Sequence, residues 1–171
     1  MKSNKALARK ILCGLLAAGV VGVSGSALAA DYDNFYYGIG DKKEINDDDV
    51  KASVIIADSG SVISFTGGGE VNIENKNDQP AYVASSKSII NFGTETKQLD
   101  KLTAKVTDDS QVLGIVMEGG VVNINAKTYE QSGSTLGLYI CDDYKTGNGA
   151  TININVDNFK SVTRVGAIQT R

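Results

Sequence analysis

Residues 119–125 read Gly119-Gly120-Val121-Val122-Asn123-Ile124-Asn125, a glycine turn signal followed by alternating aliphatic and polar side chains. This alternation has the period of a β-strand with one apolar face and one polar face. Imperfect copies of the stretch recur at residues 69–74, 88–92 and 150–155. Copies of one strand at spacings of tens of residues predict a stacked repeat.

The repeat is clearest in the second half of the chain. When Asn123 is aligned with Asn153, residues 123–129 and 153–159 place their apolar side chains at the same positions. A glycine-bearing run follows each of the last three copies, and we align these runs on their glycines: Leu113-Gly114-Ile115-Val116, Leu136-Gly137-Leu138-Tyr139 and Val165-Gly166-Ala167-Ile168. Each coil is therefore expected to hold an Asn-bearing strand, a short aromatic-bearing segment and a Gly-bearing strand, with no helix from Asp31 onward.

The pattern also predicts which side chains face inward. Aliphatic side chains on the dry face stack on their equivalents one coil away, about 4.8 Å along the stack. Burial stabilises the fold by about 1.5–3 kcal/mol for each fully buried side chain. We expect this stacking for Val122, Ile124, Ile152 and Ile154.

Asparagines occupy the wet face of the repeated strand. Amides at the strand spacing can hydrogen-bond along a stack and stabilise it without a ligand. A ligand-binding polar stripe is the alternative interpretation. The predicted structural row contains Asn72, Asn91, Asn123 and Asn153.

These patterns predict an all-β parallel β-helix, a solenoid that we expect to be truncated at its C-terminal end. The predicted domains are a signal peptide at residues 1–29, an acidic and aromatic N-terminal segment or cap at 30–50, and β-helix coils at 51–171. An antiparallel sandwich or a hairpin meander could use similar strands. The matching apolar positions of 123–129 and 153–159 favour the solenoid.

The first residues have the three parts of a secretory signal. Four basic side chains precede an apolar stretch at residues 11–23, which is short for a membrane span. An A-x-A cleavage pattern follows, with Ala27 and Ala29 before the predicted cut and Ala30 after it. We therefore expect secretion across the inner membrane and no transmembrane segment in the mature chain.

The charge of the mature part argues against nucleic-acid binding. The leader holds four of the 17 Lys and Arg residues and none of the 20 Asp and Glu residues, so the remainder has a net charge of −7. Neutralising phosphates needs clusters of Lys and Arg. We expect no nucleic-acid partner.

The composition gives little support to catalysis. The chain has no histidine, so it lacks the commonest general base and the commonest metal ligand. Aspartate pairs at 108–109 and 142–143 are expected to be solvated turn residues. Cys141 is expected to be a buried, inert thiol, and Asp47-Asp48-Asp49 lacks the spacing of a calcium loop. We therefore predict no catalytic, cofactor-binding or metal-binding residues, and no cofactor.

The leader, the Gly-Gly-x-Val-Asn-Ile runs and the run Leu136-Gly137-Leu138-Tyr139-Ile140 together resemble the passenger domains of bacterial autotransporters. The resemblance covers about residues 50–171. It implies a right-handed, pectin-lyase-like parallel β-helix that passes through a C-terminal β-barrel and is displayed on the cell surface. A translocator barrel has strands of about ten alternating residues. The sequence shows no such barrel, so we expect a missing C-terminal translocator.

We therefore expect a non-catalytic, adhesin-like passenger segment that contacts ligands on host or neighbouring cells. Its expected location is the cell surface, the outer membrane or the medium, and the periplasm if the chain is complete. The alternative is a polysaccharide-degrading β-helix, a lyase or hydrolase, which would need several carboxylates and a basic residue on one face.

Overall fold

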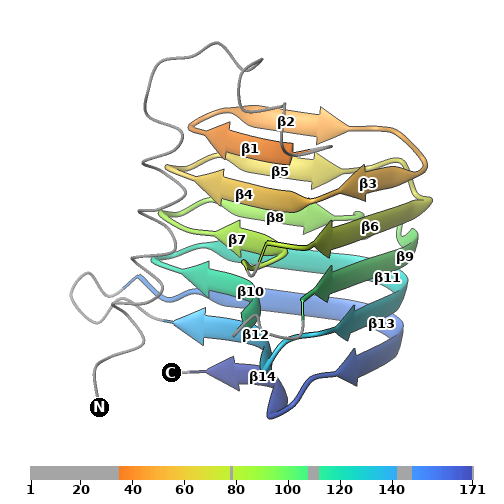
Figure 1. Cartoon of the computed structure of the whole chain (residues 1–171). Helices are drawn as coiled ribbons and strands as arrows, with labels where there is room; N and C mark the ends of the chain where they lie inside the picture. Colours follow the sequence, from red (N-terminus) through yellow and green to blue (C-terminus); the bar gives the residue numbers. More distant parts are fainter. Residues whose placement is uncertain (1–34, 78, 108–111, 142–147, 171) are drawn as a thin grey trace. The chain divides into compact units, whose positions relative to one another are not determined.

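The computed structural model describes residues 35–77, 79–107, 112–141 and 148–170. All of them belong to one compact unit, Asn34–Arg171. In this part of the chain every regular element is a β-strand and every strand pairing is parallel. The prediction of an all-β parallel solenoid is therefore confirmed. Figure 1 shows the coils stacked from β1–β3 to β13 and β14.

One sheet, the first face of the solenoid, contains one strand from each coil. Its strands pair in the order β1-β4-β7-β10-β12-β14. Several of them are apolar at successive positions, which is the pattern of parallel strands buried on both sides. The strands are β1 (Phe35–Ile39), β4 (Val54–Asp58), β7 (Tyr82–Ala84), β10 (Val112–Met117), β12 (Leu136–Cys141) and β14 (Gly166–Thr170).

A second sheet bends to form the other two faces. The second face contains β2 (Lys42–Ile45), β5 (Val62–Phe65) and β8 (Ile89–Phe92), and the third face contains β3 (Val50–Ala52), β6 (Glu70–Asn75) and β9 (Leu99–Val106). The long strands β11 (Val121–Ser132) and β13 (Thr151–Val162) run across both faces. The first half of β11 pairs with β8 and its second half pairs with β9.

The predicted inward rows lie in the core. Val122 is in register with Ile152 and Ile124 with Ile154, as the alignment of Asn123 with Asn153 predicts. Val122 and Ile124 are fully buried, whereas Ile152 and Ile154 are partly buried against the same core. Rings stack in the same way on the second face, where Phe65 and Phe92 lie with centroids 5.4 Å apart and nearly parallel planes.

The core also holds a chain of polar contacts. The hydroxyls of Tyr82 and Tyr129 lie 2.9 Å apart, and Tyr129 donates to Oε1 of Gln131 at 2.9 Å. Nε2 of Gln131 donates to Oγ of Ser161 and to the carbonyl of Ala167, both at 2.9 Å. Buried polar groups are costly unless they are paired, and these contacts join strands β7, β11, β13 and β14 across the core. Burial raises the pKa of both tyrosine hydroxyls.

The turn at residues 117–120 explains the glycines that open the repeat. Glu118 and Gly119 both have positive φ values, of 54° and 77°, and the equivalent residues one coil earlier are Ser86 and Lys87, with φ values of 52° and 62°. Glycine adopts this region without the penalty of a side chain. The N–H of Lys87 donates to the carbonyl of Glu118, so the turns stack as the strands do.

Two predictions about the coils need correction. The segment at residues 30–50 includes β1, β2 and the first residue of β3, which pair in parallel with β4, β5 and β6. The coils therefore begin before residue 51. The glycine alignment is also wrong by one residue, because Gly114 is in register with Leu138 and not with Gly137. A shift of one residue moves every side chain to the other side of the sheet.

Candidate functional site

The outer side of the second face carries a row of amides. Nδ2 of Asn91 donates to Oγ of Ser64 at 2.9 Å, and Nδ2 of Asn123 donates to Oδ1 of Asn91 at 2.7 Å. Nδ2 of Asn153 continues the series to Oδ1 of Asn123, also at 2.7 Å. These side chains lie outside because their neighbours in sequence, such as Val122 and Ile124, fill the core. Each hydrogen bond joins one coil to the next.

A parallel and shorter row lies beside the first. Nδ2 of Asn155 donates to Oδ1 of Asn125 at 3.3 Å, and both residues belong to the Asn-Ile-Asn motif. The two rows line one open hollow of about 880 Å³. Every residue that lines it is polar, acidic or glycine, and two are acidic: Glu44, Ser64, Thr66, Asn91, Gly93, Thr94, Glu95, Asn123, Asn125, Asn153 and Asn155.

One of the four predicted asparagines lies elsewhere. Asn72 is on β6, in register with Lys51 and Thr103, so it belongs to the third face. The register position in the amide row is taken by Ser64. The runs Val71-Asn72-Ile73 and Val122-Asn123-Ile124 have the same alternation, and alternation alone does not say on which face of a coil a strand lies.

Three residues of the amide rows and their hollow were not predicted from the sequence: Asn125, Asn155 and Ser64. Asn125 and Asn155 follow Asn123 and Asn153 by two residues, which places them on the same side of the strand. That spacing was a usable signal for both residues. Ser64 carried no such signal, because its strand has no asparagine.

A second hollow, of about 780 Å³, lies near the start of β3 and β6 and is acidic. Asp47, Asp49, Glu70 and Asp100 contribute to its lining, together with Lys51. Burial, and then the charge of Asp47, raise the pKa of Tyr36, which also lines the hollow.

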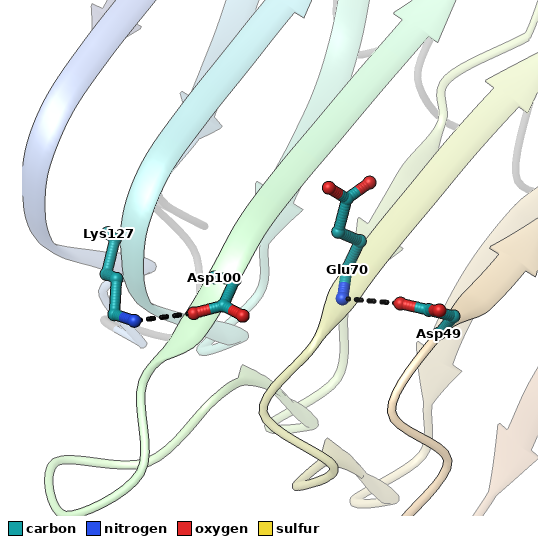
Figure 2. A network of polar contacts seen from close by, with 4 residues as sticks. All are labelled: Asp49, Glu70, Asp100 and Lys127. Atoms are coloured by element: carbon teal, nitrogen blue, oxygen red, sulfur yellow. Dashed lines mark hydrogen bonds and ion pairs between the residues drawn. The ribbon is translucent and has the colours of Figure 1, made fainter.

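Two of these carboxylates have structural contacts. Figure 2 shows that Oδ1 of Asp49 accepts a hydrogen bond from the backbone N–H of Glu70, at 3.2 Å, while the Glu70 carboxylate points away. Asp100 pairs with Nζ of Lys127 at 2.6 Å. Among the described residues, no group of three or more acidic or cysteine side chains is placed to hold a metal ion.

Some predicted positions lie outside the described residues. These include the cleavage-site alanines Ala27, Ala29 and Ala30, and the aspartate pairs at 108–109 and 142–143. Cys141 lies within them, at the end of β12, and its side chain is buried as predicted. No helix in the described ranges has the length and apolar character needed to cross a membrane.

The amide rows are suited to recognition by hydrogen bonding. Asn123 uses one N–H and one oxygen lone pair within the row, which leaves one donor and one acceptor site on the same amide. The hydrogen bonds between coils fix the orientation of each amide, and a preorganised surface loses less entropy on binding. The hollow therefore offers a regular series of oriented donors and acceptors.

Comparison with known proteins found no matching family model, no matching curated protein and no matching solved structure.

Proposed function

We propose that this chain is a non-catalytic, adhesin-like β-solenoid that is exported and binds ligands on host or neighbouring cells. The observation that carries the proposal is the amide-lined hollow on the second face. Amide side chains both donate and accept hydrogen bonds, which suits the hydroxyl groups of neutral surface glycans. The ligand class that we propose is therefore a neutral glycan.

Export is proposed from the leader at residues 1–29 and from the resemblance to autotransporter passengers. The solenoid fold supports the proposed binding role, because stacked coils form long faces that a ligand can contact. The absence of histidine from the whole sequence favours binding over acid–base catalysis.

Binding is tested with the full chain on an array of neutral oligosaccharides and on intact cells. The test variant carries Asn125→Ala and Asn155→Ala. These changes remove the shorter amide row and leave the longer row through Asn123 in place. We expect binding to weaken by about tenfold or more, because each lost hydrogen bond contributes about 1 kcal/mol.

The matched control carries Asn72→Ala and Asn158→Ala, two asparagines on the outer side of the third face. This control should bind as the wild type does. Equal loss in both variants, or no glycan binding by the wild type, would contradict the proposal.

Export is tested by immunoblotting fractions of the source cells with antiserum against residues 50–171. We expect the protein in the outer-membrane or extracellular fraction, without the leader. A protein found only in the cytoplasm with its leader intact would refute the proposed export.

A further inference from the structure

The amide-lined hollow is elongated along the stack of coils. Its lining residues belong to, or closely follow, strands β2, β5, β8, β11 and β13, which lie side by side (Figure 1). Neighbouring strands are about 4.8 Å apart, so the lining extends over about 19 Å along the stack. The two amide rows are two residues apart along each strand, which corresponds to about 7 Å. The long dimension of the hollow therefore follows the solenoid axis.

The amides of both rows point in one direction along this axis. Each Nδ2 group donates toward the preceding coil, from Asn153 to Asn123, from Asn123 to Asn91 and from Asn155 to Asn125. Hydrogen bonds arranged in series polarise one another. The two directions along the axis are therefore unlike, and a chain bound along it meets different dipoles in its two possible orientations.

The unused hydrogen-bonding groups repeat once in each coil. Asn91 and Asn123 each use one N–H and one oxygen lone pair within the longer row, so each keeps one donor and one acceptor site. The repeat of about 4.8 Å is close to the length of one hexose unit in an extended glycan chain. A chain along the axis can therefore place one hydroxyl-bearing unit over each coil, whereas a chain across the strands would leave the amides of other coils unused.

The shorter row is interrupted near the middle of the hollow. Gly93 holds the position between Thr66 and Asn125, so no side chain fills the row there. The fold requires this gap, because Gly93 has a φ value of 73° and an added Cβ atom would lie 2.2 Å from the carbonyl oxygen of Asn125. One side of the longer row therefore stays open at Asn91.

The charges around the hollow disfavour an acidic chain. Of the described residues that line it, none is a lysine or an arginine, and two, Glu44 and Glu95, are acidic. Like charges brought together across an interface weaken binding. A chain of neutral sugars avoids this repulsion.

We propose, on the basis of the glycan function proposed above, that the ligand of this hollow is a linear, extended neutral glycan that lies along the solenoid axis. Successive sugar units contact successive coils, and at least four units are needed to fill the site. The chain binds in one orientation, because the amide dipoles share one direction.

The first test measures how affinity depends on chain length. Titration calorimetry of the full chain uses oligosaccharides of cellulose, an extended neutral chain, with one to six units. We expect affinity to rise by at least about tenfold from two to four units and to level off after five. Equal affinity for short and long chains would overturn the axial arrangement and leave glycan binding intact. No binding at any length would contradict the proposed function as well.

The shape of the chain is tested with oligosaccharides of starch, which contain the same sugar in a helical chain. A straight row of amides should bind the six-unit starch chain at least about tenfold more weakly than the six-unit cellulose chain. Equal or tighter binding of the starch chain would contradict an extended ligand.

Two single substitutions at distant coils test the direction of the hollow. Thr66→Ala and Asn155→Ala lie three coils apart, about 14 Å along the stack. Each should weaken binding of the six-unit cellulose chain by about fivefold, because each removes one hydrogen-bonding group. The Asn72→Ala and Asn158→Ala variant on the third face should bind as the wild type does. Loss in only one of the two hollow variants, with both folded by circular dichroism, would refute a chain that spans the coils.

The orientation of the chain is tested with a spin label on the reducing end of the six-unit cellulose chain. The label should broaden the NMR signals of lining residues at one end of the hollow, either Ser64 and Thr66 or Asn153 and Asn155. This measurement uses the wild-type protein, so it does not depend on whether the variants fold. Equal broadening at both ends would contradict binding in one orientation.

Discussion

At the scale of single residues, the structure separates asparagines that look alike in the sequence. Asn123 lies in the middle of the amide row, where it donates to Asn91 and accepts from Asn153. Asn72 has the same aliphatic neighbours, and it donates only a long bond of 3.4 Å to Glu70 on its own strand. The two residues therefore differ in what they contribute to the stack.

This difference predicts unequal effects of the same substitution. Asn123→Ala removes two hydrogen bonds between coils and should lower the free energy of unfolding by about 1–2 kcal/mol. Asn72→Ala should change it by less than about 0.5 kcal/mol, as at an ordinary surface position. Urea unfolding of both variants measures the difference. Equal costs would show that the amide row does not stabilise the fold.

The buried tyrosines predict how stability depends on pH. Burial raises the pKa of Tyr82 and Tyr129 above the value of about 10 for an unfolded chain. Above that pH the unfolded state loses protons that the folded state keeps, so the free energy of unfolding should fall as pH rises. Below about pH 10 both states are protonated, and the two tyrosines produce no slope.

A Tyr82→Phe and Tyr129→Phe double variant provides the control for this prediction. Each tyrosine should contribute a slope of up to about 1.4 kcal/mol per pH unit above pH 10, and the double variant should lose that part of the slope. Urea unfolding of both proteins between neutral and alkaline pH provides the comparison. Parallel curves for the two proteins would contradict the prediction.

At the scale of elements, the strands of the first face depend on small residues where a neighbouring coil approaches closely. A Cβ atom added to Gly114 on β10 would lie 2.6 Å from Cε2 of Tyr82. Gly114 is in register with Tyr82, so the glycine makes room for the ring of the preceding coil. A Cβ atom added to Gly166 on β14 would meet no atom within 4 Å.

Alanine at these two glycines should therefore have different effects. Gly114→Ala overfills the core beside Tyr82 and should cost about 1–3 kcal/mol of unfolding free energy. Gly166→Ala should change it by less than about 0.5 kcal/mol. Thermal and urea unfolding of the two variants decide between these expectations. A neutral Gly114→Ala would mean that β7 and β10 pack less closely than the structure shows.

The sequence was sufficient to predict the strands and the stacking of Asn153 on Asn123, because alternation and turn glycines are local signals. It was not sufficient to assign each strand to a face. For this reason Asn72 was predicted in the amide row at a level where the structure has Ser64, since the link between two strands decides which strand stacks on which. The one-residue error at Gly114 and Gly137 has a similar cause: register is set by contacts between coils, such as the fit of Gly114 to Tyr82.

At the scale of the whole molecule, each described coil contacts mainly its neighbours along the stack. Stability in such a protein is approximately a sum of contributions from coils and from the interfaces between them. The amide hollow and the buried tyrosines both depend on this parallel arrangement. An antiparallel sandwich made from the same strands would keep none of them.

The most direct test of the parallel stack is the measurement of scalar couplings across hydrogen bonds by NMR on isotope-labelled protein. A parallel stack predicts couplings from the first residue of β5, β8, β11 and β13 to a carbonyl one coil earlier. The donor and acceptor pairs are Val62 to Asp41, Ile89 to Ser61, Val121 to Ser88 and Thr151 to Gly120. Couplings in this repeating pattern would establish the parallel register. Couplings that join these strands as antiparallel pairs would contradict the solenoid and the functions proposed from it.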